Sequence, residues 1–188
     1  MRLYVVRHGE SETNQSKRWT GWLDVHLTAN GKADAQKVSE FLKGVSFDKI
    51  YTSDLSRAIE TAEIAITNCH YEKTRLLREI NVGSLSNLPI SVLSDSQRLQ
   101  VFQNGYADFD GETKEELYKR ILQFRKKLET LNYETVAAFT HAGWMSGLLD
   151  TVVEACLQRK HICCDNCAIA IFEFQNEIWR LHSWINFS

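Results

Sequence analysis

Two histidines stand where predicted strands end, and each is followed by a glycine within two residues. His8-Gly9 follows the β-rich residues 2–6, and His141-Ala142-Gly143 follows residues 136–140. The carboxyl ends of parallel strands meet at one edge of a sheet, where open α/β sheets bind ligands, so we expect the two imidazoles to meet there. A neutral imidazole is a competent nucleophile toward phosphorus near physiological pH. The pair therefore predicts phosphoryl transfer through a covalent intermediate on His8.

Phosphoryl transfer also needs fixed positive charge and an acid. Negative charge on the equatorial oxygens must be met by hydrogen-bond donors, and Arg7 directly precedes the first histidine. Arg57 stands in the first turn of a predicted helix, where free N–H groups and the helix dipole favour an anion. Glu79 follows a short predicted strand and is the best-placed carboxyl to protonate a leaving alkoxide. These residue types together predict a site for phosphoryl transfer.

Alternating strands and helices are expected to position these groups. The predicted strands cover residues 2–6, 47–52, 74–78, 136–140, 167–174 and 177–184, the last two forming a hairpin that turns near Gln175-Asn176. The predicted helices cover residues 28–44, with Thr28 as N-cap and Gly44 as stop, then 53–66, 113–131, opened by a capping box at Thr113, and 144–157. This order predicts a three-layer α/β/α sandwich with a mixed, mainly parallel sheet.

The segment from about residue 81 to 110 is interpreted as a short lid insertion over the site. It carries Gly, Ser, Asn and the one proline of the chain, without sustained apolar periodicity. The whole chain, residues 1–188, is short enough to bury one core, so we expect a single domain.

Composition excludes several classes of protein. Apolar residues make up 44% and charged residues 24%, and the formal net charge of −2 argues against nucleic-acid binding. No run of about 18 apolar residues could span a membrane, and the first ten residues become charged too early for a secretory signal. We therefore expect a cytoplasmic enzyme whose partner is a small-molecule phosphate ester. A homodimer remains open.

The cysteines and tryptophans invite other interpretations that the pattern does not favour. Cys164 and Cys167 have the spacing of half a zinc site, but a second such pair is missing, and Cys156 or His161 would have to complete an irregular one. Buried or loop thiols, including Cys163, are the simpler prediction. The five tryptophans are more typical of core and pocket wall than of a base-stacking platform, because no basic patch accompanies them.

These residues resemble the histidine phosphatase superfamily, also called phosphoglycerate mutase-like, over nearly the whole chain. The hallmark appears as Arg7-His8-Gly9-Glu10, followed by Thr13 and Asn14. Further matching segments are 19–22, 27–31, 51–58, 61–63, 77–79, 111–113, Arg120 and 140–143. The resemblance implies His8 as nucleophile, Glu79 as proton donor, and a phosphate pocket made of Arg7, Asn14, Arg57 and His141. It implies no metal or other cofactor. It also implies that Thr13, Thr20, Gly21 and Ala142 contact the substrate.

The chain departs from the pattern of the family at two places. Relatives usually follow the acid with Gly, a variable residue, then an aromatic residue, Glu and Gly, where this chain has Gly83-Ser84-Leu85-Ser86-Asn87. After His141-Ala142-Gly143, relatives commonly carry a small residue, an apolar one and arginine, where Trp144-Met145-Ser146 stands here. We expect the lid contacts to differ and the bulk of Trp144 to fill part of the pocket. Both changes affect the choice of substrate more than the phosphate cradle.

Three functions remain in view. The favoured one is a phosphomonoesterase for a small metabolite, such as a sugar phosphate or a nucleoside-like ester of the cobalamin pathway. The alternatives are a bisphosphoglycerate-dependent phosphoglycerate mutase, which typically has a longer lid that excludes water, and a non-catalytic binder of phosphorylated ligands.

Each residue also has a purely structural alternative. His8 could be a core histidine, and His141 could cap the turn from strand to helix. Arg57 could pair with Glu60 or Glu63 on an exposed helix face. Glu79 could simply be solvated, and Asn14 and Thr13 could be ordinary loop hydrogen-bonders.

Overall fold

A computed structural model describes residues 1–154 and 163–187, and within them six strands form one sheet in the order β3-β2-β4-β1-β5-β6. The strands are β1 (Arg2–Arg7), β2 (Lys49–Thr52), β3 (Tyr71–Lys73), β4 (Thr135–Thr140), β5 (Ile169–Gln175) and β6 (Ile178–Ile185). Strands β1 to β4 run parallel, whereas β5 runs antiparallel to β1 and β6 antiparallel to β5. The predicted mixed, mainly parallel sheet is confirmed.

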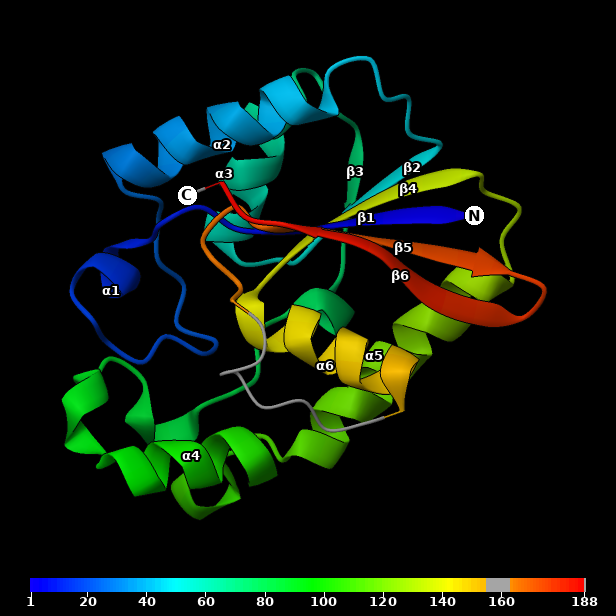
Figure 1. The fold of residues 1–188 in the computed structure, drawn as a ribbon. Helices are drawn as coiled ribbons and strands as arrows, with labels where there is room; N and C mark the ends of the chain where they lie inside the picture. The colour runs from blue at the N-terminus through cyan, green and yellow to red at the C-terminus, as the bar shows by residue number, and fades with distance from the viewer. Residues whose placement is uncertain (155–162, 188) are drawn as a thin grey trace.

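Helices cover both faces of the sheet. They are α1 (Glu12–Gln15), α2 (Ala29–Leu42), α3 (Ser56–Ala65), α4 (Asp95–Asn104), α5 (Lys114–Glu129) and α6 (Ala142–Val153), with short 3-10 turns at Arg75–Leu77, Gly83–Leu85, Ile90–Val92 and Ala107–Phe109. Figure 1 shows α2 and α3 on one face and α5 and α6 on the other, which confirms the three layers. Helices α1 and α4 lie toward the carboxyl ends of the parallel strands. No helix among the described residues is long and apolar enough to cross a bilayer.

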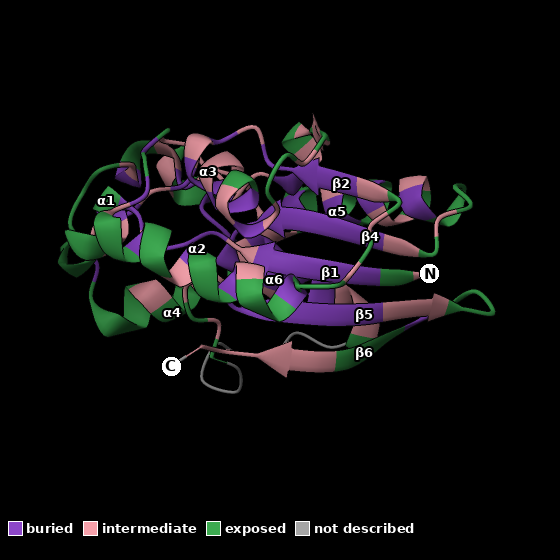
Figure 2. Cartoon of the chain, turned by 90° about the horizontal axis from the view of Figure 1, so that it is seen from above, coloured by how far each residue is buried: buried purple, intermediate pink, exposed green. Residues whose placement is uncertain are grey.

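Two apolar cores stabilise this arrangement, one on each face of the sheet. Because side chains alternate along a strand, Leu3 and Val5 of β1 pack toward α5 and α6, whereas Val6 packs toward α2 and α3. The central strands are buried on both faces, as is usual for parallel strands covered by helices (Figure 2). The rigid sheet therefore presents the carboxyl end of β1 as a fixed platform.

The helix boundaries that the sequence marks with capping residues are confirmed. The Thr28 side chain accepts a hydrogen bond from the Gly31 N–H at the start of α2. Thr113 and Glu116 form the predicted capping box of α5. After α2, Gly44 has φ +82°, a left-handed conformation that suits glycine at the end of a helix.

Two strand predictions were wrong in detail. The strand expected at 74–78 lies earlier, at Tyr71–Lys73, and residues 75–77 form a 3-10 turn instead. The Thr74 side chain accepts a hydrogen bond from the Leu76 N–H, and such local bonds compete with strand pairing. The hairpin turns at Asn176 and Glu177, both with positive φ, one residue later than expected.

Two helices were not predicted, and a third begins earlier than expected. Helix α4 lies within the 81–110 segment and begins with a capping box of Ser94 and Gln97. Val101 is the one residue of α4 that is buried, so the helix has no apolar stripe for the sequence to reveal. Helix α1 spans a single turn, Glu12–Gln15. Helix α6 begins at Ala142 rather than at residue 144, and residues 155–157 of its predicted end lie outside the described residues.

Candidate active site

The two histidines lie side by side at the carboxyl ends of neighbouring strands. Strand β1 pairs with β4 so that Arg7 is opposite Thr140, and the His8 N–H donates to the Thr140 carbonyl at 3.0 Å. The imidazole rings of His8 and His141 have centroids 5.1 Å apart. The sheet therefore brings together two groups separated by more than one hundred residues, as the strand-end argument predicts.

Hydrogen bonds assign the tautomer of His8. Its Nδ1 lies 2.7 Å from the Gly9 carbonyl, which can only accept, so Nδ1 carries the proton. Its Nε2 accepts from the Arg57 Nε–H at 3.2 Å and therefore holds the lone pair. Burial, and then the charges of Arg57 and Arg7, lower the pKa of His8 well below 6.5. His8 is thus a neutral imidazole whose Nε2 can act as a nucleophile.

The backbone around the predicted nucleophile, His8, is packed tightly against the start of α2. A side chain at Gly9 would place its Cβ 2.3 Å from the Gly31 carbonyl oxygen, and one at Gly31 would place its Cβ 2.1 Å from the Glu10 carbonyl oxygen. The Gly9 N–H donates to Thr61 of α3 at 3.0 Å. Both glycines are required here for close approach, and the loop after β1 is held from two sides.

Arg57 is buried and fixed in orientation. Its guanidinium donates to the Leu23 carbonyl at 3.0 Å and to the Gly21 carbonyl at 2.9 Å, and the residue is 1% exposed. Burial lowers the pKa of Arg57 to about 10, so it stays charged at neutral pH. Glu60 and Glu63 instead bond His26 and Tyr71, so the exposed ion-pair alternative is wrong. A guanidinium has five N–H donors, and two remain for an anion after these bonds and the one to His8.

Asn14 is held so that its amide nitrogen is the end available to a ligand. Its Oδ1 accepts from the Ser11 N–H at 3.2 Å and from the Asn166 Nδ2 at 3.2 Å. Asn166 also donates to the His8 carbonyl at 3.3 Å, so it links Asn14 to the backbone of His8. Asn166 was not predicted, because its segment drew attention only for its cysteines. Arg7 donates to the carbonyl of Cys164 in the same segment.

His141 is fully buried and lies behind His8. Its Nε2 is 2.9 Å from the Ser53 Oγ, and its Nδ1 has no hydrogen-bond partner within the described part of the chain. Although His141 occupies the N-cap position of α6, its side chain makes no capping bond, so the capping alternative is wrong. A buried imidazole nitrogen is costly to leave unpaired, and a phosphate oxygen would satisfy it. Its role in the pocket stays a prediction.

The Glu79 carboxylate faces the site from the turn after β3. Its Oε2 accepts from the Gly143 N–H at 3.2 Å, and its Oε1 accepts from the Ile80 N–H at 2.9 Å. A side chain at Gly143 would place its Cβ 2.4 Å from Oε1, so glycine is needed for this approach. The turn that follows His141 therefore also positions the predicted acid.

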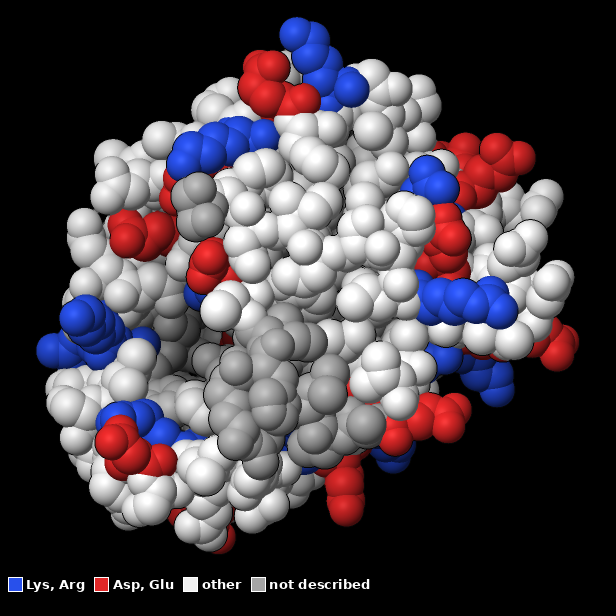
Figure 3. All heavy atoms as spheres, viewed as in Figure 1, with Lys and Arg blue, Asp and Glu red and all other residues white. Residues whose placement is uncertain are grey.

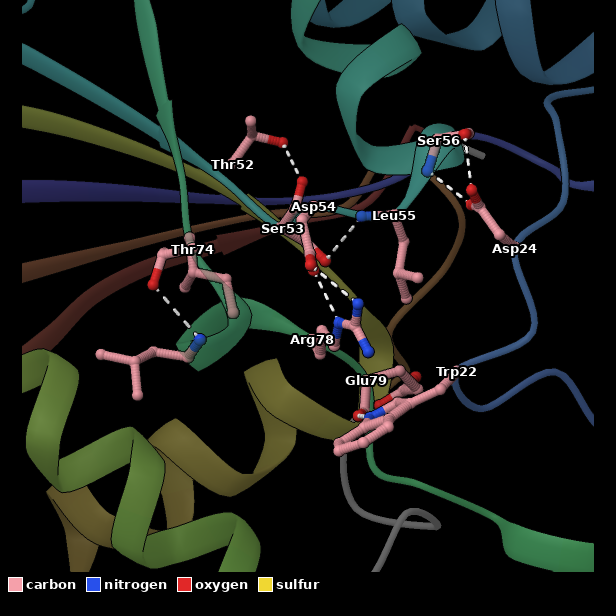
Figure 4. A network of polar contacts seen from close by, with 12 residues as sticks. Trp22, Asp24, Thr52, Ser53, Asp54, Leu55, Ser56, Thr74, Arg78 and Glu79 are labelled. Atoms are coloured by element: carbon pink, nitrogen blue, oxygen red, sulfur yellow. Dashed lines mark hydrogen bonds and ion pairs between the residues drawn. The ribbon is translucent and has the colours of Figure 1, made fainter.

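Residues far away in the sequence hold the backbone of Glu79. Its carbonyl accepts from the Trp22 indole N–H at 2.6 Å and from Arg120 at 3.0 Å. Figure 4 shows Glu79 beside Trp22, with Arg78 next to them. Arg120 also bonds the Arg78 carbonyl and pairs with Glu112 at 2.6 Å. The resemblance matched Arg120 and Glu112 without giving them a role, and the structure shows that they support the predicted acid.

Arg7, His8, Asn14, Arg57 and Glu79 line a cavity of about 160 Å³, and His141 is not among the lining residues. Its lining residues are Arg7, His8, Asn14, Arg18, Trp19, Thr20, Gly21, Arg57, Glu79, Ile80, Val82, Ile90, Phe102, Tyr106 and Ala142. The predicted residues Thr20, Gly21 and Ala142 belong to this lining. Thr13 does not, because its hydroxyl is turned to the Thr20 hydroxyl at 2.6 Å. Figure 3 shows the surface hollowed on the side of α1 and α4, with charged side chains of both signs around the rim.

The expectation that Trp144 fills the pocket was wrong. Its side chain is fully buried in the core, with its ring centroid 5.7 Å from that of Phe124 on α5. Its indole N–H donates to the Leu76 carbonyl at 2.7 Å. Because α6 begins at Ala142, the first turn of the helix directs Trp144 to α5 instead of the cavity.

The cysteine segment does not form a metal centre within the described residues. Cys163 and Cys167 have free thiols, and among the described residues no group of three or more His, Cys, Asp or Glu side chains is arranged to hold a metal ion. Burial raises the pKa of Cys167 to about 12, which keeps it a thiol. Cys156 and His161 lie outside the described residues.

The buried neutral histidines predict a pH-dependent stability. The pKa of His8 and of His141 is lowered below 6.5 in the folded chain, so below about pH 6.5 these histidines bind protons in the unfolded chain but not in the folded chain. The free energy of unfolding therefore keeps its full value above about pH 6.5. It decreases as the pH falls below that value, by up to about 1.4 kcal/mol per pH unit for each proton. Urea unfolding between about pH 7 and pH 5 should show a shallower decline for His8→Ala than for the unsubstituted chain.

A matched substitution elsewhere controls this measurement. Glu60 raises the pKa of the exposed His26, so His26→Ala should not make the decline shallower. Equal slopes for His8→Ala and the unsubstituted chain would show that His8 is not held neutral by folding.

Comparisons with known proteins show the family of this chain. The family model of the histidine phosphatase superfamily (branch 1) matches residues 3–186. The probable phosphoglycerate mutase GpmB of Citrobacter koseri is 30% identical, over 98% of this chain and 90% of the relative. The Entamoeba histolytica phosphoserine phosphatase, solved in complex with 3-phosphoglyceric acid, is 26% identical with a TM-score of 0.83, over 98% of this chain and 96% of that one.

A third comparison bears on the fold alone. The alpha-ribazole phosphatase of Shigella flexneri has a TM-score of 0.85 at 23% identity, over 98% of this chain and 96% of that one. Because the family model covers nearly every residue, this chain belongs to the histidine phosphatase superfamily.

Proposed function

We propose that this chain is a metal-independent phosphomonoesterase that hydrolyses a small phosphorylated metabolite through a phosphohistidine on His8. One observation carries the proposal: a neutral imidazole with its Nε2 lone pair directed to a buried guanidinium, in a cavity that also contains a carboxylate. Membership of the superfamily and a phosphatase among the similar structures support it.

The first step transfers the phosphoryl group to the protein. His8 Nε2 forms a bond to phosphorus as the bond from phosphorus to the ester oxygen breaks in line. The protonated Glu79 carboxyl gives its proton to the departing oxygen, which leaves as an alcohol. Arg7, Arg57 and Asn14 hold the equatorial oxygens, and their fixed orientation stabilises the transition-state charge without reorganisation.

The second step hydrolyses the phosphohistidine and regenerates His8. Glu79, now a carboxylate, removes a proton from water, and the oxygen of that water attacks the phosphorus of phosphohistidine. The bond from phosphorus to Nε2 breaks, inorganic phosphate leaves, and His8 is again neutral. One carboxyl therefore acts as acid and then as base, and the Gly143 and Ile80 N–H groups keep it in place between the two steps.

A mutase is the main alternative, favoured by the name of the Citrobacter relative. A mutase must keep water away from its phosphohistidine until the second acceptor hydroxyl arrives. The segment available for this, residues 81–110, is short, which favours hydrolysis. A non-catalytic binder is disfavoured because the predicted nucleophile and the predicted acid are both present in the cavity.

An assay of phosphate release separates the three functions. We expect the purified protein to release inorganic phosphate from an aryl phosphate, at a rate unchanged by a chelator. A mutase would convert 3-phosphoglycerate to 2-phosphoglycerate, in the presence of bisphosphoglycerate, faster than it releases phosphate. A binder would release none, and a metal-dependent phosphatase would lose activity with the chelator.

A further inference from the structure

The cavity has an aromatic wall on the side of α4, which the chemistry described above does not use. The wall consists of Trp19, Phe102 and Tyr106, with the Trp19 ring centroid 6.0 Å from that of Phe102 and 5.7 Å from that of Tyr106. Ile90 and Val82 add apolar surface to the same lining. The phosphate pocket lies at the end of β1, so the wall is available to the leaving group of the ester.

The wall also carries a donor that the described residues leave unpaired. The indole N–H of Trp19 is buried without a hydrogen-bond partner in the described part of the chain. By contrast, the indole of Trp22 donates to the Glu79 carbonyl and that of Trp144 to the Leu76 carbonyl. A buried N–H without a partner is costly, so this donor indicates a wall that a bound molecule completes.

The charges around the cavity argue against a second anionic group on the substrate. Among the described lining residues, Arg18 is the single cation besides Arg7 and Arg57. Its guanidinium already donates to the Asn87 carbonyl of the 81–110 segment. Arg18 offers one further charge, whereas the three rings of the wall offer none. A carboxylate or second phosphate placed against the wall would lose water without a paired charge, which is unfavourable.

From this aromatic wall, whose rings carry no charge, we infer the class of substrate: a monophosphate ester whose leaving alcohol is uncharged and carries an aromatic ring. The inference rests on the proposed hydrolysis and names its substrate class. Aromatic rings gain from edge-to-face packing beyond the area they bury. The volume, about 160 Å³, is below the roughly 300 to 1,000 Å³ of sites for drug-sized ligands, so a single ring fits better than a dinucleotide.

The test compares three esters that all release a primary alcohol, so that the reactivity of the leaving oxygen is similar. A difference in rate then reports how well the rest of the alcohol binds. The probes are benzyl phosphate, cyclohexylmethyl phosphate and 3-phosphoglycerate, each followed by release of inorganic phosphate. We expect kcat/KM for benzyl phosphate to exceed that for 3-phosphoglycerate by at least about tenfold. Cyclohexylmethyl phosphate should fall between them, because it fills the volume without an aromatic face.

Substitutions in α4 then locate the preference. Phe102→Ala should reduce the ratio of kcat/KM for benzyl phosphate over 3-phosphoglycerate by about tenfold. Phe102→Leu keeps apolar volume, so it should fold if the alanine variant does not, and it should bring benzyl and cyclohexylmethyl phosphate to similar values. Leu99→Ala is the matched control, since Leu99 is on the same helix, 49% exposed and outside the cavity lining.

The outcomes separate the two proposals. Equal or better turnover of 3-phosphoglycerate, or a benzyl preference that survives both Phe102 substitutions, would overturn the substrate class while leaving the hydrolysis intact. No phosphate release from any of the three esters would overturn the proposed function, and the substrate class with it.

Discussion

His8→Ala should lower kcat for any phosphate ester by at least about 10⁴-fold, because loss of the covalent nucleophile of a hydrolase has effects of that order or larger. Among the described residues, His141 is the histidine next to His8, but it does not line the cavity and its Nε2 is engaged with Ser53, so it is not placed to act as a substitute. Phosphate release measures the loss directly. A radiolabelled phosphate ester, quenched with denaturant, should leave label on the unsubstituted chain that is stable to base and labile to acid, and none on His8→Ala.

The control for this substitution is His26→Ala. His26 is a surface histidine paired with Glu60, outside the cavity lining, so its removal should leave both turnover and labelling unchanged. Retention of more than about a tenth of kcat by His8→Ala would mean that water attacks phosphorus directly or that another residue is the nucleophile.

Glu79→Gln should lower kcat for an alkyl phosphate by about 10²- to 10⁴-fold, the usual range for loss of a general acid. The glutamine keeps the size of the side chain and an oxygen for the Gly143 N–H, so the change is mainly one of proton transfer. With 4-nitrophenyl phosphate the leaving phenolate needs no proton, and the first step should survive better. Rapid mixing should then show a burst of about one nitrophenolate per chain, followed by slow turnover as the phosphohistidine waits for a base.

Glu115→Gln makes the same chemical change on an exposed position of α5 and should retain full activity with both esters. Equal losses with alkyl and nitrophenyl esters, and no burst, would argue that Glu79 only maintains the shape of the pocket.

The parts of the fold that the sequence reveals are those in which local pattern and tertiary role coincide. Residues 3–6 of strand β1 are continuously apolar because both faces are buried there. Helices α2 and α5 carry capping residues and an apolar stripe. Placing His8 and His141 together needed only the rule that parallel strands end at one edge. Helix α4 was not predicted because nearly all of its residues face solvent, so its sequence has no helical repeat of apolar residues.

The supports of the site were hidden for a different reason. Trp22, Arg120 and Asn166 act through hydrogen bonds to backbone carbonyls, and any residue offers a carbonyl, so the partner leaves no trace in the sequence. Trp144 shows the opposite error. Its place next to a site motif suggested a pocket residue, but the angle at which α6 begins sends it into the core.

The contact between Gly9 and Gly31 bears on how this site could be engineered. Two main-chain segments touch there with no side chain between them, one next to the proposed nucleophile and the other in the first turn of α2. Moving α2 along its axis would therefore shift the reactive nitrogen itself. A design that transfers this site to a new scaffold must therefore include both backbone segments in their present arrangement. Both Gly9 and Gly31 must be kept as glycine.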